Sequence, residues 1–188
     1  MPFTATILPG VIIFEPAVFP DGRGFFFESY NRHLFQANHI ANDFVQDNQS
    51  FSVYGVIRGL HYQREPHAQA KLVRVLQGRI LDVVVDLRMG SPGFGKSYCI
   101  ELSAENKKQI FIPKGFAHGF SVLSETAELS YKCDQFYNKQ SESGVHYNDA
   151  SLKIDWQIPA GRELISDKDT LLPGFDLSLL DFIYTKDV

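Results

Sequence analysis

Apolar and polar residues alternate in many short segments of this chain. The clearest alternation covers residues 81–87 (LDVVVDL), with four aliphatic residues on one face and Asp82 and Asp86 on the other. A spacing of two is typical of a β-strand. Similar runs are VIIFEP (11–16), LVRVLQ (72–77), SYCIEL (97–102), QIFIP (109–113), GFSVLS (119–124), ELSYKC (128–133) and LKIDW (152–156). Most of them end at turn-forming residues, so the pattern predicts a sandwich, barrel or jelly roll of short strands.

Helical patterns are few. Residues 30–41, with Leu34 and Phe35 as apolar positions and Asn31 as an N-cap, predict one short helix. The run SLLDFIY (178–184) is compatible with a helix or a strand. Because no repeat, low-complexity tract or linker divides the sequence, we expect residues 1–188 to form a single domain. The tail from about residue 175 receives no function.

Composition and charge narrow the class of protein. A net charge of -4 and a pI near 5.8 argue against nucleic-acid or membrane-surface binding, which needs a basic surface. Cys99 and Cys133 lack metal-binding spacing and are interpreted as reduced thiols. The sequence shows neither a secretory signal nor a membrane span, so a cytoplasmic location is expected.

One segment concentrates positive charge. Residues 58–74 contain Arg58, His61, Arg64, His67, Lys71 and Arg74 against a single acid, Glu65. A solvated strand edge would also carry such residues. Strand alternation places Arg58 on the face of Leu60 and Tyr62, and His61 with Gln63 on the opposite face. His61 then lies between two large apolar neighbours, which favours a functional face over a solvated edge.

A second segment resembles the cupin superfamily, whose fold is a double-stranded β-helix. Pro113, Gly115 and His118 form P-x-G-x-x-H, similar to the second cupin signature. The first signature carries two histidines one residue apart, but the matching stretch here places Gln63 after His61. Glutamine is a poor replacement for imidazole on zinc, iron or manganese. We therefore expect a cupin barrel without metal, which performs acid–base or binding chemistry.

Longer blocks resemble one family. They are DGRGFFFESYN, FVQDN, VIRGLHYQ, AQAKLVRVLQG, DVVVDLR, SPGFGK, LSAENKKQIFIPKGFAHGF, YKCDQFY and ISDKD, in this order between about Ile12 and Asp169. Together they resemble the dTDP-4-dehydrorhamnose 3,5-epimerases. The resemblance implies a mainly β, cupin-type jelly-roll barrel with a few short helices, no cofactor and a homodimer. It also implies epimerisation at C3 and C5 of dTDP-4-dehydro-6-deoxy-D-glucose, in the synthesis of dTDP-L-rhamnose for lipopolysaccharide O-antigen.

The same resemblance implies four catalytic residues. C3 and C5 of the substrate flank a C4 ketone, so their hydrogens are weakly acidic. His61 matches the base, and Asp169 matches the carboxylate that orients and stabilises it. Lys71 matches the group that stabilises the enolate on O4. Tyr131 matches the proton donor, and nearby cations are expected to lower its pKa.

Further positions match substrate contacts of the family. They are Arg23, Glu28, Gln46, Asp47, Asn48, Arg58, His118, Glu142 and Lys168. Arg23 and Arg58 suit a diphosphate, because guanidinium groups bind phosphate oxygens in pairs. Phe136 and Lys139 depart from the family pattern, which often has Tyr and Pro there. Three cations receive no role: Arg64, His67 and Arg74.

Other functions remain open. An epimerase acting on one carbon, or a ketoisomerase, would use nearly the same residues on a dTDP-4-keto-6-deoxyhexose. A metal-dependent cupin oxygenase would bind iron or manganese. A sugar-nucleotide binding module would hold the ligand without exchanging its protons.

Overall fold

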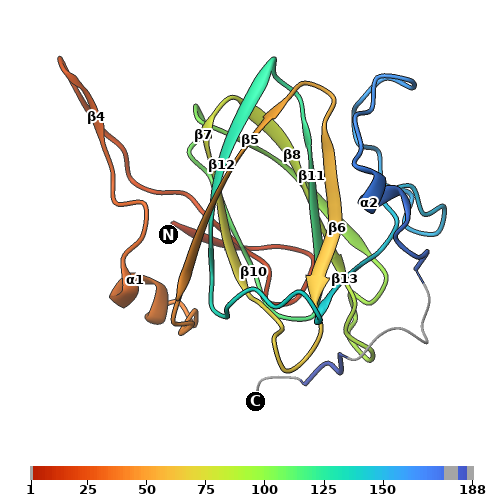
Figure 1. Ribbon diagram of the computed structural model, residues 1–188. Coiled ribbons are helices and arrows are strands. Elements are labelled where there is room, and N and C mark those ends of the chain that lie inside the picture. The colour runs from red at the N-terminus through yellow and green to blue at the C-terminus, as the bar shows by residue number, and fades with distance from the viewer. Residues whose placement is uncertain (1, 176–181, 186–188) are drawn as a thin grey trace.

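The structure, a computed structural model, describes residues 2–175 and 182–185, and these residues form two facing antiparallel sheets (Figure 1). One sheet has the order β1 (Phe3–Ala5), β2 (Ile12–Phe14), β10 (Gln109–Ile112), β7 (Lys71–Gln77), β12 (Thr126–Cys133) and β5 (Gln46–Val53). The other has the order β13 (Glu142–Gly144), β6 (Ile57–Gln63), β11 (Phe116–Val122), β8 (Arg79–Asp86) and β9 (Ser97–Ser103). The mainly β jelly roll predicted from the sequence is confirmed.

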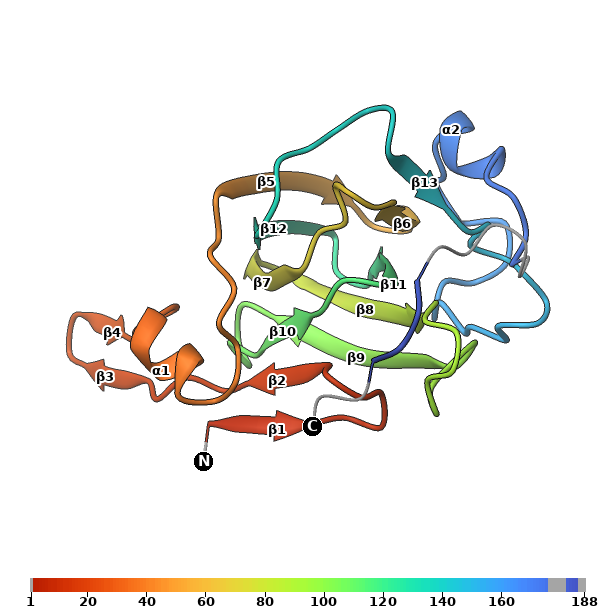
Figure 2. The same ribbon diagram turned by 90° about the horizontal axis from the view of Figure 1, so that it is seen from below.

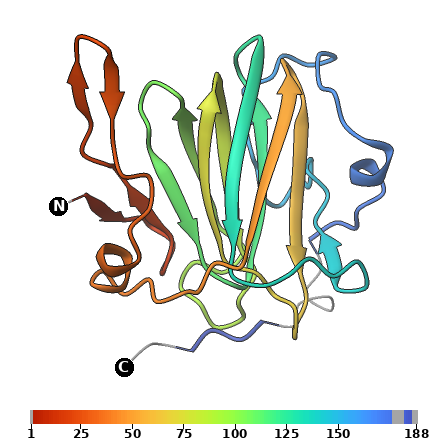
Figure 3. The same ribbon diagram turned by 60° about the vertical axis from the view of Figure 1, so that its left-hand side comes forward.

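Three small elements lie outside the two sheets. The hairpin of β3 (Phe19–Asp21) and β4 (Gly24–Phe26) projects away from the barrel, as Figure 3 shows. Helix α1 (Arg32–Gln36) lies beside this hairpin, and α2 (Asp167–Thr170) lies on the other side of the barrel (Figure 2). Within the described residues, no helix has the length and apolar character needed to cross a bilayer.

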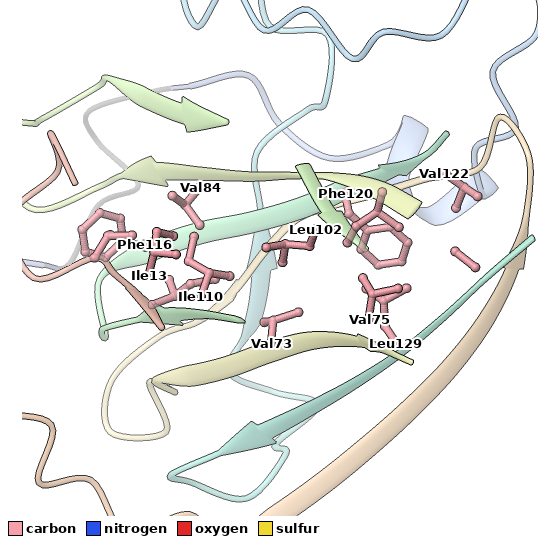
Figure 4. Close-up of a cluster of buried hydrophobic side chains, with 14 of the residues drawn as sticks. Ile13, Val73, Val75, Val84, Leu102, Ile110, Phe116, Phe120, Val122 and Leu129 are labelled. Atoms are coloured by element: carbon pink, nitrogen blue, oxygen red, sulfur yellow. The ribbon is translucent and has the colours of Figure 1, made fainter. Parts of the chain in front are cut away.

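The barrel interior is filled by aliphatic and aromatic side chains from both sheets. Figure 4 shows a cluster that includes Val73, Val75, Ile110 and Leu129 from the six-stranded sheet. These residues alternate with outward-facing positions on their strands, as expected for a half-buried pleated surface. The interdigitation of the two inner faces holds the sheets together and keeps water from the middle of the barrel.

Strand β8 is buried on both faces. Leu81 and Val83 belong to a second cluster on the outer face of the five-stranded sheet, covered by Val145 and Trp156 of the C-terminal segment. Asp82 lies on the interior face and is fully buried. The alternation in residues 81–87 therefore predicts the strand correctly, but its polar face is not the solvent face.

The helix predicted over residues 30–41 is shorter in the structure. Asn31 is its N-cap, and the Asn31 side chain accepts a hydrogen bond from the Leu34 N–H at 3.2 Å. The helix ends at Gln36, and His39 has a left-handed φ of 63°, which breaks the helical path. Phe35 is the one buried residue of α1 and packs against the phenylalanines of the six-stranded sheet.

The strand predicted for LKIDW (152–156) is wrong. Residues 152–156 form no strand, although Leu152 and Trp156 are buried on the outer face of the five-stranded sheet. The Ser121 hydroxyl donates to the Trp156 carbonyl at 2.7 Å. The alternation thus records packing onto a sheet without strand pairing. Of SLLDFIY, residues 178–181 lie outside the described residues, and Ile183 forms an isolated bridge with Met89.

Strands β6 and β11 approach each other closely next to His61. His118 pairs with His61 and Phe120 with Arg58, so β6 holds one more residue than β11 over this stretch. This bulge brings Arg58 and His61 to one pocket, and the predicted strict alternation between them is wrong. At Gly59, whose φ is 131°, an added Cβ would lie 2.5 Å from the Gly119 Cα.

We expect Gly59→Ala to lower the free energy of unfolding by about 2 kcal/mol or more, because the methyl group forces two backbones apart at a φ that favours glycine. Urea denaturation measures the change. Gly22→Ala is the control, since an added Cβ there meets nothing within 4 Å. Equal stability of the two variants would contradict the close approach.

Candidate active site

A cavity of about 170 Å³ opens at one end of the barrel. Its lining residues are Gln46, Asn48, His61, Tyr62, Gln63, Gln69, Lys71, Tyr131, Tyr137 and Glu142. Strand pairing explains part of this grouping, because Tyr131 on β12 lies opposite Asn48 on β5 and Cys133 lies opposite Lys71 on β7. Three of the four side chains predicted as catalytic, His61, Lys71 and Tyr131, thus share one cavity.

The fourth, Asp169, lies directly behind His61. Its Oδ1 is 2.7 Å from His61 Nε2, and its Oδ2 accepts a hydrogen bond from the Gly59 N–H at 3.2 Å. Asp169 is 3% exposed and sits in α2, whose N-cap is Ser166. The short helix therefore holds the carboxylate against β6, although 108 positions separate it from His61.

Asp169 is ionised at neutral pH. Burial alone would raise the pKa of Asp169, but the hydrogen bond with His61, the charge of that ring and the Gly59 N–H together keep the pKa below its usual value. Because an ionised carboxylate only accepts hydrogen bonds, His61 Nε2 carries the hydrogen. The lone pair of neutral His61 is then on Nδ1, the ring atom available to act as a base.

Lys71 and Tyr131 are shifted by burial in opposite senses. Burial lowers the pKa of Lys71, and the negative charge of Asp82 and Glu142 offsets part of this effect. Burial raises the pKa of Tyr131, and the charge of Arg58 opposes it more weakly. Arg58 thus acts in the expected direction, but burial outweighs it, so the expected net lowering of the Tyr131 pKa is wrong. The phenol keeps its proton at neutral pH and can donate it.

Cys133 lies next to Lys71 but is not a nucleophile at neutral pH. Burial raises the pKa of Cys133 to about 11, although the charge of Lys71 opposes the shift. The Asn48 side-chain amide lies 3.7 Å from its sulfur. Cys133 is buried and Cys99 is exposed, and both are free thiols, as the sequence predicts.

A second pocket of about 520 Å³ adjoins the cavity at His61. Arg58 and Lys168 line it and give it positive charge. Lys168 donates to Glu142 Oε1 at 2.5 Å, and the Tyr137 hydroxyl donates to Glu142 Oε2 at 3.0 Å. Burial would raise the pKa of Glu142, but these two hydrogen bonds lower it, so the carboxylate is ionised. The structure therefore joins the cavity to a pocket that holds two cations, Arg58 and Lys168, beside the carboxylate of Asp169.

His118 lies inside the barrel and contacts an acid rather than the cavity lining. Its Nε2 is 2.9 Å from Asp82 Oδ2, and both side chains are buried. His118 nevertheless pairs with His61 across the neighbouring strands. Over residues 2–175 and 182–185, no group of three or more His, Cys, Asp and Glu side chains is placed to hold a metal ion.

Besides His118, three predicted substrate contacts lie away from both pockets of this chain. Arg23, at the tip of the β3–β4 hairpin, is 90% exposed at its side chain and pairs with Asp21. Glu28 follows the hairpin and accepts from the Asn31 amide at 3.3 Å. Asp47 points to the outer face of the six-stranded sheet and binds Lys132 at 2.8 Å.

Sequence reasoning missed four cavity residues, which are Tyr62, Gln63, Gln69 and Tyr137. All four lie in blocks that carry the family resemblance, yet none received a role in the site. The sequence signal for Gln63 was its position, which holds the second histidine in the first cupin signature. The sequence signal for Tyr137 was a pair of adjacent aromatic residues, Phe136 and Tyr137, within a segment that is otherwise polar.

A histidine–carboxylate pair, a buried lysine and a protonated tyrosine at the end of a jelly roll define a barrel enzyme of the acid–base type. A family model described as dTDP-4-dehydrorhamnose 3,5-epimerase matches residues 5–176. The chain belongs to this family of isomerases, and its barrel is of the cupin type.

Individual relatives agree with this assignment. The chain is 54% identical over 165 residues to a dTDP-4-dehydrorhamnose 3,5-epimerase from Shigella flexneri, covering 87% of this chain and 90% of the relative. A crystal structure of this enzyme from Elizabethkingia anophelis has a TM-score of 0.88 and 55% identity, and the match covers 92% of this chain and 95% of that one. A dTDP-6-deoxy-D-glucose-3,5-epimerase from Legionella pneumophila, in complex with dTDP-4-keto-L-rhamnose, has a TM-score of 0.92 and 44% identity over 98% of both chains.

We expect Asp169→Asn to lower the free energy of unfolding at pH 7 by about 2 kcal/mol, because the hydrogen bonds to a buried charge are weakened. The Asp169 pKa is lower in the folded state, so its contribution is present above the unfolded pKa near 4 and is lost as pH falls through the folded pKa. Urea denaturation between pH 3 and 7 measures the difference from the wild type. Asp167→Asn, an exposed change in the same helix, is the control. A difference that does not shrink in acid would contradict an ionised Asp169.

Proposed function

We propose that this chain epimerises C3 and C5 of dTDP-4-dehydro-6-deoxy-D-glucose and forms dTDP-4-dehydro-L-rhamnose, in the synthesis of dTDP-L-rhamnose. The observation that carries the proposal is the 2.7 Å contact between His61 and Asp169 at a cavity that also holds Lys71 and Tyr131. These are the groups that a proton transfer next to a ketone needs. We expect the enzyme to act in the cytoplasm.

The first half of the reaction is removal of a proton. His61 Nδ1 removes a proton from C3 or C5, which is acidic because the carbon is next to the C4 ketone. Asp169 stabilises the imidazolium that forms. The electron pair moves onto O4, where the ammonium of Lys71 stabilises the enolate. Since this charge appears mainly in the transition state, a preorganised cation lowers the barrier rather than only binding substrate.

The second half returns a proton to the opposite face of the carbon. His61 lies on β6 of the five-stranded sheet, and Tyr131 lies on β12 of the six-stranded sheet. A hexose ring between the facing sheets would therefore meet the base on one face and the phenol on the other. Inversion follows from this separation, and both carbons share the same C4 ketone. Protein groups supply every proton transfer, so the reaction calls for no cofactor.

The nucleotide part would extend from the cavity mouth. The side chains of Arg58 and Lys168 offer positive charge to a diphosphate, while Gln46, Asn48 and Glu142 offer hydrogen bonds. His118 supports the interior next to His61. Arg58 and Lys168 give a chain of net charge -4 a local set of cations that can bind an anion.

We expect the enzyme in D2O to place deuterium at both C3 and C5 of the keto sugar, as NMR can measure. His61→Asn should abolish exchange at both carbons, a loss of at least about a hundredfold, because the proposal makes His61 the base for both proton removals. Its affinity for dTDP, measured by calorimetry, should remain.

The outcomes separate the alternatives. Label at one carbon defeats the double epimerisation and favours an epimerase acting on a single carbon. Binding without any exchange in the wild type favours a binding module. Exchange that a chelator abolishes favours a metal-dependent enzyme.

We infer a homodimer from large apolar side chains that are exposed in the single chain. The β3–β4 hairpin exposes Phe19, Phe25 and Phe26, and the outer face of β5 exposes Phe51. An isolated chain does not keep such apolar surface in water at low cost. If the hairpin packs on a second copy, it can carry Arg23 into the partner's site, with Glu28 close behind it.

Light scattering should therefore give a dimer. Arg23→Ala and His61→Asn should each be inactive alone, but co-expression should restore about a quarter of the wild-type activity, because half of the dimers are mixed and each has one intact site. Absence of recovery, with mixed dimers present, would place Arg23 in the site of its own chain. Full activity of Arg23→Ala alone would place Arg23 outside any site.

A further inference from the structure

The loop between β12 and β13, residues 134–141, forms part of the rim of the cavity. It carries Phe136, which is 62% exposed, and Tyr137, which lines the cavity and is 54% exposed. A loop with such exposed aromatic side chains has little packing of its own to fix it. Its position must come from hydrogen bonds to the neighbouring strand and loop.

Gln63 supplies these hydrogen bonds on both sides of Tyr137. Its Nε2 donates to the carbonyl of Phe136 at 3.3 Å and to the carbonyl of His67 at 2.6 Å. Its Oε1 accepts from the Asn138 N–H at 2.7 Å. The opposite orientation of the amide would face its oxygen to two carbonyls and its nitrogen to an N–H, so this orientation alone satisfies all three partners.

Tyr137 itself is held from two more directions. Its backbone N–H donates to Gln46 Oε1 at 2.9 Å, and its hydroxyl donates to Glu142 at 3.0 Å. Gln63 fixes the peptide groups on either side of these contacts. Gln63 therefore helps to hold the loop where the Tyr137 hydroxyl reaches Glu142.

The loop after β6 forms a second layer of support. His67 Nδ1 lies 2.9 Å from the Ser141 hydroxyl, and the Gln69 amide donates to the Gln135 carbonyl at 2.7 Å. The Arg64 N–H donates to the Ser141 carbonyl at 2.8 Å. Gln63 joins the two loops near their middle, and its side chain is buried, with only 5% of the residue exposed.

We propose that Gln63 is a positioning residue that fixes Tyr137 at the cavity mouth and thereby sets the affinity for the nucleotide sugar, without taking part in proton transfer. The position that holds the second histidine of the cupin signature serves here to anchor a loop. Gln63 is two residues after His61 on β6, so one strand presents the base and positions the rim. This inference rests on the proposed function for the identity of the ligand.

Gln63→Met tests the proposal, because methionine keeps the length of the side chain and removes its three hydrogen bonds. We expect the KM for the keto sugar and the Kd for dTDP to rise about tenfold, the upper end for lost hydrogen bonds, while kcat changes less than about threefold. Ser121→Ala is the matched control. It removes a buried hydrogen bond to a backbone carbonyl on the outer face of the barrel, and should lower Tm without changing KM.

A double-mutant cycle with Tyr137→Ala tests whether Gln63 affects KM by positioning Tyr137. If Gln63 acts through Tyr137, Gln63→Met should change KM less than about twofold in the Tyr137→Ala background. Should Gln63→Met fold poorly, Gln63→Glu replaces it, since glutamate keeps the acceptor for Asn138 but repels the two carbonyls. It should raise KM in the same direction.

Three results would overturn the proposal. They are a lowered Tm with unchanged KM and Kd, a fall in kcat at unchanged KM, and full additivity with Tyr137→Ala. Lack of turnover in the wild type would instead reject the proposed function. Unchanged dTDP affinity of Gln63→Met beside normal wild-type turnover would reject the role of Gln63 alone.

Discussion

The hydrogen bond between His61 and Asp169 joins two parts of the chain that are 108 positions apart, and the site depends on it. It forms because α2 packs against β6, where the Gly59 N–H also binds the carboxylate. Gly59 can sit there because it faces Gly119 without side chains between the strands. The close approach of Gly59 and Gly119 thus helps to position the carboxylate of Asp169, which orients His61.

The two-sheet architecture separates the reactive groups. His61 belongs to one sheet, and Lys71 and Tyr131 belong to the other. Burial raises the pKa of Tyr131 and keeps the phenol protonated. Burial lowers the pKa of Lys71, and the negative charge of Asp82 and Glu142 opposes this shift and favours the ammonium. A hexose held between the sheets would be approached from both faces, which is what inversion at a carbon requires.

Local pattern predicted much of this fold, and long-range geometry explains the rest. Alternation located β8 and the capping residue located the start of α1, because both depend on neighbouring residues. Alternation also predicted a strand for LKIDW (152–156), because buried residues that pack on a sheet show the same pattern as residues of a paired strand. Strand alternation also placed Arg58 and His61 on opposite faces of β6, which is wrong because the bulge depends on pairing with β11. Family resemblance selected six of the ten residues that line the cavity. The support that Gln63 gives to Tyr137 depends on a contact across 75 positions of the chain, which no local pattern records.

The central claim is that base and acid act from opposite faces of the ring. Tyr131→Phe in D2O tests it most directly, by comparing deuterium uptake with the configuration of the labelled carbon. His61 should still remove a proton and return deuterium to the same face, giving exchange with retained configuration and epimer formation reduced by about a hundredfold. Epimerisation at the wild-type rate, or the loss of all exchange, would contradict the account.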